Sequence, residues 1–202
     1  MKRFLVTAAL VFGLAGAAHA QEATQVTAPP TGAVVMLHTT MGNVEVTLDP
    51  AGAPKSAAQF LQLTKNRYFN GAIVYRVEPG FVIQFGDLDE KLQYRDPKLP
   101  GIPLETEHNR HSRGAVSFAR GDELDSGKNV LFISLADNSS LNATEGAAPN
   151  TTGYAVFGHV TAGMDIVDAI AATELAPEGG PFPSKLPKTP VIVTTVEVVR
   201  GG

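Results

Sequence analysis

Residues 68–87 read Tyr-Phe-Asn-Gly-Ala-Ile-Val-Tyr-Arg-Val-Glu-Pro-Gly-Phe-Val-Ile-Gln-Phe-Gly-Asp, and this stretch is the most informative part of the chain about the fold. Two β-prone runs, 72–77 and 81–85, flank the dipeptide Pro79-Gly80. Proline and glycine are strong turn formers, so the pattern predicts two strands joined by a tight turn.

Three side chains of this stretch are candidates for one functional surface. Arg76 precedes the turn, while Phe81 and Gln84 follow it, and the three could share one face. Together they would offer a charged guanidinium fork, an apolar wall and a neutral amide that both donates and accepts hydrogen bonds. No Ser/His/Asp set, cysteine nucleophile, phosphate-binding loop or carboxylate pair accompanies them in the sequence.

Further β-prone runs lie on both sides of this segment. We expect strands at 34–39, 43–48, 115–119, 130–135, 155–160 and 191–199. Two amphipathic helices are expected, one that opens at Pro54 and one over 164–171. Because helices and strands do not alternate, a doubly wound parallel sheet is excluded. The predicted fold class is mainly β, a closed eight-stranded antiparallel β-barrel with two flanking α-helices, since closure removes exposed edges.

The N-terminal residues have the pattern of an export signal. Lys2-Arg3 forms a short positive region, and 4–14 is an apolar run of about eleven residues, too short to span a bilayer core of about 30 Å as a helix. Ala18-His19-Ala20 matches the small-residue pattern after which signal peptidases cleave. We therefore predict a cleaved signal peptide at 1–20, a mature chain that begins at Gln21 and a periplasmic localisation.

The rest of the chain is expected to form one soluble, monomeric domain without a membrane anchor. Residues 21–33 are small and polar, which predicts a flexible leader, and 34–200 contains no linker and no internal repeat. Of 202 residues, 44% are hydrophobic, which is enough for a core. The net charge of −4 gives no basic surface for nucleic acid. There is no cysteine, so no disulfide and no acylated anchor is expected.

The chain resembles the cyclophilin family of peptidyl-prolyl isomerases at several motifs in the same order. The family pattern reads roughly aromatic-His-Arg-Val-x-Pro-x-Phe-x-x-Gln-Gly-Gly-Asp, and residues 74–87 match it at most positions. Residues 113–120 resemble the strand that lines the peptide groove of the family, and 130–133 occupy the place of its Gln-Phe-Phe-Ile. Residues 153–165 resemble the segment that closes the pocket, so the resemblance covers about 34–199.

This resemblance implies a role for each site residue and an activity that needs neither a cofactor nor a metal. Arg76 would be the catalytic cation, and Gln84 would hold the backbone of the substrate. The other implied substrate-binding residues are Phe81, Val82, Phe132 and Leu141 around the proline ring, Phe118, Ala119 and Arg120 beside the preceding residue, and Tyr154, where relatives have histidine or tyrosine.

The chemistry of X–Pro bonds suits these residue types. Amide resonance raises the rotation barrier to about 18–20 kcal/mol, so uncatalysed exchange takes tens to hundreds of seconds. A guanidinium that donates to the imide nitrogen, or steadies the carbonyl, stabilises the twisted form more than the planar one. We therefore expect an isomerase that assists the folding of exported proteins, with proline-containing peptides and unfolded exported chains as its partners.

Four positions depart from the family pattern. Val130 replaces the groove glutamine, which removes a polar contact to the peptide, and Ser140 replaces the aromatic residue before the pocket leucine. Phe85 stands where the family has the first glycine of Gly-Gly-Asp, and Tyr75 replaces a histidine. We expect activity, at a reduced rate or with an altered peptide preference.

Two other classes of protein remain open on the sequence alone. A non-catalytic chaperone or adaptor of the same fold would bind proline peptides without turnover; Val130 and Ser140 favour it, and Arg76 argues against it. A small-molecule carrier of the lipocalin type would need a hollow barrel with polar anchors. The stretch 105–111 contains a His-x-x-His pair, which we interpret as a solvated loop before a strand rather than a metal site.

Overall fold

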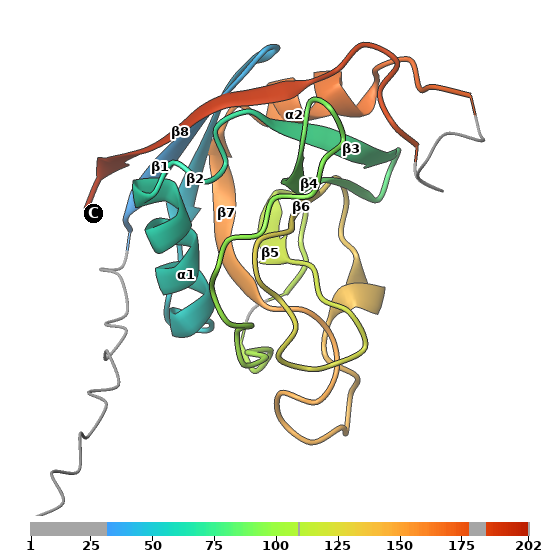
Figure 1. The fold of residues 1–202 in the computed structure, drawn as a ribbon. Coiled ribbons are helices and arrows are strands. Elements are labelled where there is room, and N and C mark those ends of the chain that lie inside the picture. The colour runs from blue at the N-terminus through green and yellow to red at the C-terminus, as the bar shows by residue number, and fades with distance from the viewer. Residues whose placement is uncertain (1–31, 109, 178–184, 202) are drawn as a thin grey trace, which may run out of the picture.

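The computed structural model describes residues 32–108, 110–177 and 185–201, so the predicted signal peptide and most of the predicted leader lie outside the described residues. In this part of the chain eight antiparallel strands close into one barrel, in the order β1-β2-β7-β5-β6-β4-β3-β8 (Figure 1). The strands are β1 (Val34–Thr39), β2 (Gly42–Leu48), β3 (Ala72–Glu78), β4 (Val82–Asp89), β5 (Ala115–Phe118), β6 (Leu131–Ser134), β7 (Val156–Ala162) and β8 (Ile192–Arg200). The predicted fold class is confirmed.

Two α-helices pack against this barrel, as the sequence predicts. Helix α1 (Pro54–Lys65) contacts β7 and β8, and helix α2 (Met164–Ala171) contacts β2, β3 and β4. A short 3-10 helix, η1 (Ser139–Leu141), follows β6. Within the described ranges, neither helix is both long and apolar enough to cross a membrane.

Buried aromatic side chains fill the barrel. Phe157 on β7 is fully buried, and its ring centroid lies 5.1 Å from that of Phe60 on α1 and 4.9 Å from that of Phe118 on β5. Inward side chains from all eight strands join the same apolar cluster. Because the described interior is occupied by side chains, the barrel has the packed centre of a small barrel rather than the hollow centre of a carrier.

The 68–87 segment folds as the sequence predicts, with one addition. β3 and β4 pair around a turn in which the Phe81 N–H donates to the Glu78 carbonyl at 2.9 Å, and Gly80 supplies the positive φ of 76°. Between Val74 and Arg76 the register shifts by one residue, so Tyr75 is the extra residue of a β-bulge. β4 is also longer than predicted and continues to Asp89.

The stretch 105–111 lies before β5, and Glu107, His108 and Arg110 are exposed as the sequence suggested, but its two ends are held against the protein. The Glu105 carboxylate accepts hydrogen bonds from the N–H groups of Lys55 and Ser56, at 3.0 and 2.9 Å, and from the Ser56 hydroxyl at 2.8 Å. It thereby caps the N-terminus of α1, where Ala53 has no side-chain acceptor. Across the described residues, no group of His, Cys, Asp and Glu is arranged to hold a metal ion.

Candidate active site

The candidate site is built on a row of residues that pair across three strands. Arg76 on β3 pairs with Gln84 on β4, and Gln84 pairs in turn with Phe132 on β6. Residues that are directly opposite in neighbouring strands face the same side of the sheet. Leu131 and Ile133, on either side of Phe132, enter the barrel core. The row therefore faces outward, and it joins a cation, an amide and an aromatic ring on one surface.

The β-bulge at Tyr75 turns Arg76 to this outer surface. Val74 and Val77 both enter the core, so strict alternation from Val74 would have pointed Arg76 inward. With Tyr75 as the extra residue, Tyr75 and Arg76 both lie on the outer side. The Arg76 side chain is 31% exposed, and its Nη1 donates to Gln84 Oε1 at 3.2 Å.

A hydrogen-bond chain fixes the orientation of the Gln84 amide. Gln84 Nε2 donates to the Tyr75 hydroxyl oxygen at 2.8 Å, which leaves Gln84 Oε1 to accept from Arg76. Burial, reinforced by the nearby Asp87 carboxylate, raises the pKa of Tyr75, so the phenol keeps its proton. Burial also raises the pKa of Asp87, while hydrogen bonds from a backbone N–H and from the Tyr75 hydroxyl oppose that rise. The protonated phenol is therefore the fixed acceptor for the amide beside Arg76.

An aromatic cluster lies next to this row, where the sequence predicts the proline pocket. Phe132 is 4% exposed, and its ring stacks on His111, with centroids 5.7 Å apart and planes 13° apart. Tyr154 meets the Phe132 ring edge-on at 5.6 Å. Phe81 is anchored through its carbonyl, which accepts hydrogen bonds from the Leu135 N–H and from Asn138 Nδ2, each at 2.8 Å. Phe132, His111 and Tyr154 therefore form one aromatic cluster beside Gln84.

The sequence interpretation missed three residues in and around this cluster, namely His111, Asn138 and Asn142. His111, placed there in a solvated loop, is 2% exposed, and its Nδ1 and backbone N–H both lie within hydrogen-bond distance of Asn142 Oδ1 (3.0 and 2.9 Å). Asn138 is buried and holds Phe81. A single polar residue in a loop has no periodicity, and His111 lies 31 residues from Asn142 in the chain, so the sequence pattern gave no signal.

Leu141 and Ser140 stand on the rim of the pocket, on η1. The Leu141 carbonyl accepts a hydrogen bond from the Tyr154 N–H at 3.1 Å, which places the half-buried leucine beside the aromatic pair. Ser140 is exposed. At the position where the family has an aromatic side chain, this chain therefore has only the solvent-exposed hydroxyl group of Ser140.

The predicted role of Phe118 needs a correction. Its ring is 3% exposed, packs against Phe157 in the core and pairs across the ladder with inward-facing Leu131. The outward neighbour is Ser117, which pairs with Phe132. The side chain of Phe118 is therefore not available to flank a substrate, because strand alternation turns it into the barrel.

Arg120 and Ala119 follow β5 and continue the outer surface. Arg120 Nε donates to the Gly153 carbonyl at 3.0 Å, and the guanidinium carbon lies 5.3 Å from the centroid of the Tyr154 ring. This cation–π contact holds Arg120 against the pocket wall. Val82 is buried at the start of β4, and Ala119 is half-buried, with its N–H donating to the Val130 carbonyl at 2.9 Å.

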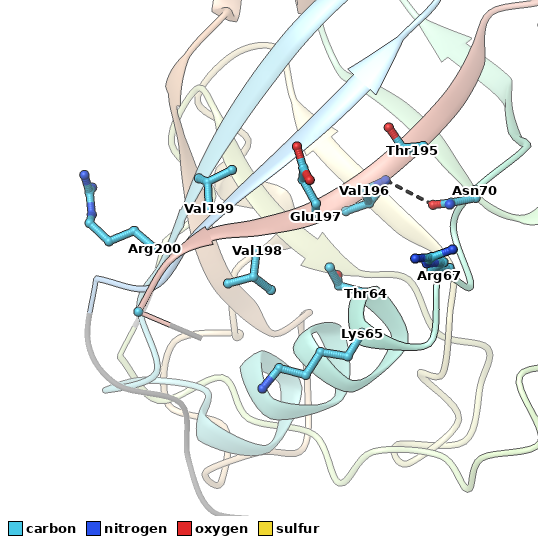
Figure 2. A pocket seen from close by; sticks show the side chains of 11 residues that line it. Thr64, Lys65, Arg67, Asn70, Thr195, Val196, Glu197, Val198, Val199 and Arg200 are labelled. Atoms are coloured by element: carbon cyan, nitrogen blue, oxygen red, sulfur yellow. Dashed lines mark hydrogen bonds between the residues drawn. The ribbon is translucent and has the colours of Figure 1, made fainter.

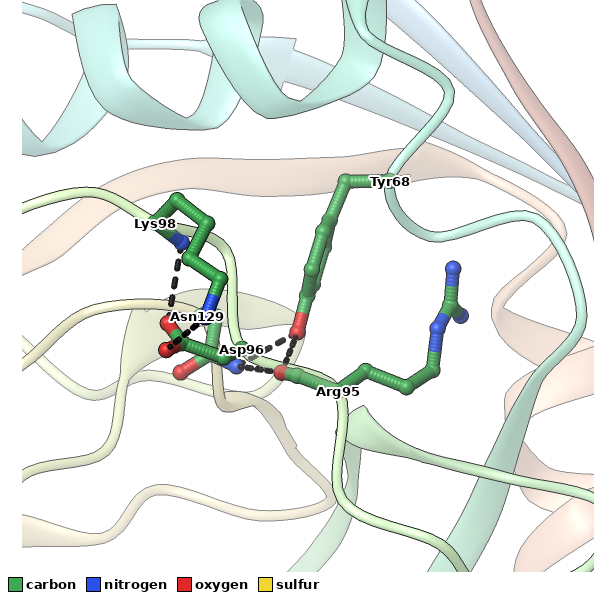
Figure 3. A network of polar contacts seen from close by, with 5 residues as sticks. All are labelled: Tyr68, Arg95, Asp96, Lys98 and Asn129. Atoms are coloured by element: carbon green, nitrogen blue, oxygen red, sulfur yellow. Dashed lines mark hydrogen bonds and ion pairs between the residues drawn. The ribbon is translucent and has the colours of Figure 1, made fainter.

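A buried polar network fixes the segment that carries Val130 (Figure 3). Asn129 Nδ2 donates to the Tyr68 hydroxyl at 2.6 Å and to the Arg95 carbonyl at 3.1 Å, and the Tyr68 hydroxyl also donates to that carbonyl. Burial raises the pKa of Tyr68. The Asn129 amide is buried, and its hydrogen bonds are made to groups inside the protein. It therefore does not replace the glutamine amide that the family has in the groove at the position of Val130.

Phe85 does not obstruct the groove. Its side chain is buried in the barrel core opposite Val74, so the departure from the family glycine adds core volume rather than bulk at the site. The next residue, Gly86, is where a side chain has no room. Its φ is 130°, and a Cβ there would come within 2.2 Å of the Asn129 carbonyl oxygen.

Comparison with known proteins gives one consistent result. Residues 34–198 match the family "Cyclophilin type peptidyl-prolyl cis-trans isomerase/CLD". The chain is 36% identical over 168 residues to a peptidyl-prolyl cis-trans isomerase of Acinetobacter baylyi, covering 82% of this chain and 85% of the relative. It is 32% identical over 200 residues to peptidyl-prolyl cis-trans isomerase A of Dickeya dadantii, covering 98% of each.

Solved structures show the same fold. Cyclophilin AquaCyp293 from Hirschia baltica matches with a TM-score of 0.66 at 20% identity, over 85% of this chain and 76% of that chain. A cyclophilin type isomerase of Cryptosporidium parvum, solved in the presence of the dipeptide Ala-Pro, matches with a TM-score of 0.63 at 20% identity, over 83% of this chain and 99% of that chain.

We predict that protonation of His111 destabilises the protein. Burial lowers the pKa of His111 below its ordinary value of 6.5, so the unfolded chain binds this proton more readily. The contribution of neutral His111 to the free energy of unfolding is complete above pH 6.5. It is lost as the pH falls through 6.5 toward the pKa of His111 in the folded state. The free energy of unfolding, measured by urea titration between about pH 7 and pH 5, should therefore fall, with at most about 1.4 kcal/mol per pH unit from this one group.

The His111→Phe variant, which keeps an aromatic ring on Phe132, should show a shallower fall. His38 is the matched control, because its hydrogen bond to Glu197 raises its pKa, so His38→Gln should steepen the fall. Equal pH slopes for the wild type and His111→Phe would contradict the prediction.

Proposed function

Because the chain belongs to the cyclophilin-type peptidyl-prolyl cis-trans isomerase family, we propose that Arg76 catalyses rotation about X–Pro bonds at the surface described above, in proteins exported from the cytoplasm. The observation that carries the proposal is the row Arg76–Gln84–Phe132, which sets a guanidinium beside an aromatic cluster.

The proposed mechanism divides the work between a pocket and a cation. The proline ring is held by Phe132, Leu141 and Tyr154 while the rest of the peptide rotates. Arg76 Nη1 is turned toward Gln84, and a guanidinium carries further N–H groups that can donate to the imide nitrogen as it loses resonance. Such a bond is stronger to the twisted amide than to the planar one, so it lowers the barrier. These steps need no covalent intermediate.

The surroundings of Arg76 keep it oriented without neutralising it fully. Its Nη2 lies 3.9 Å from Glu78 Oε1, a long contact, and Glu78 also pairs with Lys185 Nζ at 3.3 Å. The carboxylate is therefore shared between two cations. A partly exposed guanidinium in this setting retains the positive charge that the proposed transition state needs.

We assign Tyr75 as a positioning residue for this reaction. It does not touch the proposed reacting atoms; its hydroxyl accepts from Gln84 Nε2 and so turns the amide oxygen toward Arg76. A histidine, which the family has at this position, can accept the same bond through a ring nitrogen. Tyr75 therefore orients the Gln84 amide with a hydroxyl group in place of the ring nitrogen of the family's histidine.

The pattern at residues 1–20 supports the exported part of the proposal. A positive start, a short apolar run and Ala18-His19-Ala20 form the three parts of a cleavable signal. The proposed clients are unfolded exported proteins that contain X–Pro bonds, and the proposed compartment is the periplasm.

Isomerisation of short X–Pro peptides tests the role of Arg76. We expect the purified mature protein to accelerate exchange, as measured by NMR exchange spectroscopy, and Arg76→Ala to lower kcat/KM by about 10²–10³-fold, the usual loss for a transition-state donor. Arg76→Lys, which keeps the charge but loses the fork, should be intermediate. Folded wild type without activity across several residues before proline, or full activity in Arg76→Ala, would contradict the proposal.

A double-mutant cycle tests the positioning role of Tyr75. Tyr75→Phe should lower kcat/KM about 2-fold to 13-fold, the value of one lost hydrogen bond of about 0.5–1.5 kcal/mol. In the Gln84→Met background, where there is no amide to orient, Tyr75→Phe should have no further effect. Tyr75→His should restore activity, and Tyr94→Phe, at an exposed position, is the control. Additive losses in the cycle would show that Tyr75 acts independently of Gln84.

Expression of the whole chain in a bacterium tests the export proposal. We expect the protein in the periplasmic fraction with Gln21 as its first residue, measured by mass spectrometry. An Ala20→Pro variant should block cleavage and leave the protein attached to the membrane. Recovery of the uncleaved wild type from the cytoplasm would rule the proposal out.

A further inference from the structure

The last strand of the barrel is paired along only one of its two edges. β8 pairs with β1 from Val193 to Arg200, but it pairs with β3 only at Ile192 and Val193. Beyond Val193 the second edge of β8 turns toward the C-terminal end of α1, and a groove of about 770 Å³ separates the two elements (Figures 1 and 2). This volume is in the range of binding clefts.

The backbone of β8 presents hydrogen-bonding groups to this groove. The Val196 N–H donates to Asn70 Oδ1 at 3.1 Å (Figure 2), so the Asn70 side chain takes the place of a carbonyl from a neighbouring strand. By the alternation of an antiparallel ladder, Val198 directs its N–H and carbonyl to the same side. Among the described residues, neither of these Val198 groups has a recorded partner across the groove.

This edge has the regular geometry that strand pairing requires. The register between β1 and β8 shifts before Thr195 and after Val198, and it is regular between them. Proteins usually protect such an edge with bulges, proline or an inward charge. Here the bulges lie at the two ends, so the groove-facing groups between them that Asn70 does not occupy can pair with another strand.

Cations surround the groove. Lys65 at the end of α1, Arg67 just after it and Arg200 at the end of β8 are all exposed (Figure 2). The lining carboxylate, Glu197, is already engaged by His38 Nε2 at 3.0 Å. In a chain of net charge −4, this local excess of positive charge favours an acidic ligand. Val199, 48% exposed, and half-buried Val198 add apolar surface.

We propose that this groove binds an extended, acidic segment of another polypeptide, which pairs its backbone with the groove-facing groups of β8 that Asn70 leaves free, at Val198 and the Val196 carbonyl, and sets its carboxylates beside Lys65, Arg67 and Arg200. Strand addition of this kind draws affinity from the main chain and selectivity from the flanking charges. The groove shares no residue with the Arg76 site, so this inference does not depend on the proposed function. A client bound at both places would be held while its X–Pro bond rotates.

The probe is a short synthetic peptide without proline, in which valine alternates with glutamate. We expect it to bind the mature protein at low ionic strength, about 20 mM salt, and to shift the amide NMR signals of Val196 and Val198. The Lys65→Glu/Arg67→Glu variant should weaken binding about tenfold or more, while its isomerisation of short X–Pro peptides stays unchanged. Lys91→Glu/Arg110→Glu is the control with the same charge change at exposed positions elsewhere.

Two further comparisons isolate the backbone contacts. A peptide N-methylated at alternate residues should lose binding, and so should Val198→Pro, which removes an outward N–H without touching the β1 ladder. No binding of the unmodified peptide up to about 1 mM, equal binding by the Lys65→Glu/Arg67→Glu variant, or equal binding of the N-methylated peptide would each overturn the proposal.

Discussion

The β-bulge at Tyr75 is the constraint on which the candidate site depends. A regular strand would place Arg76 on the same face as Val74, and that face is the barrel core. A buried, unpaired guanidinium would cost several kcal/mol, so the regular alternative is strongly disfavoured. The one extra residue instead gives two consecutive outward side chains. Tyr75 then contacts the nitrogen of the Gln84 amide, and Arg76 contacts its oxygen. The bulge therefore places on the outer surface both the cation and the residue that orients its amide partner.

The register of the neighbouring strands extends this arrangement to the pocket. Gln84 pairs with Phe132, and Phe132 pairs with Ser117, so one outward row continues over four strands. The inward residues beside that row, such as Phe85 and Phe118, build the core on the other face. Substitutions that depart from the family pattern therefore differ in consequence. Phe85 only adds to the core, whereas Val130 and Ser140 change the surface that a peptide would meet.

Closure of the barrel explains why two separate surfaces exist. β3 and β8 pair directly at only two positions, Ala72 with Val193 and Ile73 with Ile192. The two antiparallel strands overlap only at their first residues, and beyond them β3 bonds to the segment before β8, with the Val74 N–H donating to the Val191 carbonyl at 2.9 Å. The far end of β3 carries Arg76 to the candidate active site, and the far end of β8 leaves an edge open toward α1. The same limited contact thus separates the candidate active site from the groove that we propose for an acidic strand.

The sequence by itself determined the mainly β barrel, the two helices and the relation between Arg76 and Gln84. These features rest on local patterns, and Arg76 and Gln84 are only eight residues apart across one turn. The family resemblance supplied the remaining site residues. All four residues of β5 are buried, so its hydrophobic pattern does not reveal that Ser117 rather than Phe118 faces the site. Only the tertiary structure decided three features, namely the stacking of His111 on Phe132, the bulge at Tyr75 and the open edge of β8. The stacking and the open edge depend on pairing between segments that are distant in the chain. The bulge depends on a register shift, which leaves no mark in the composition.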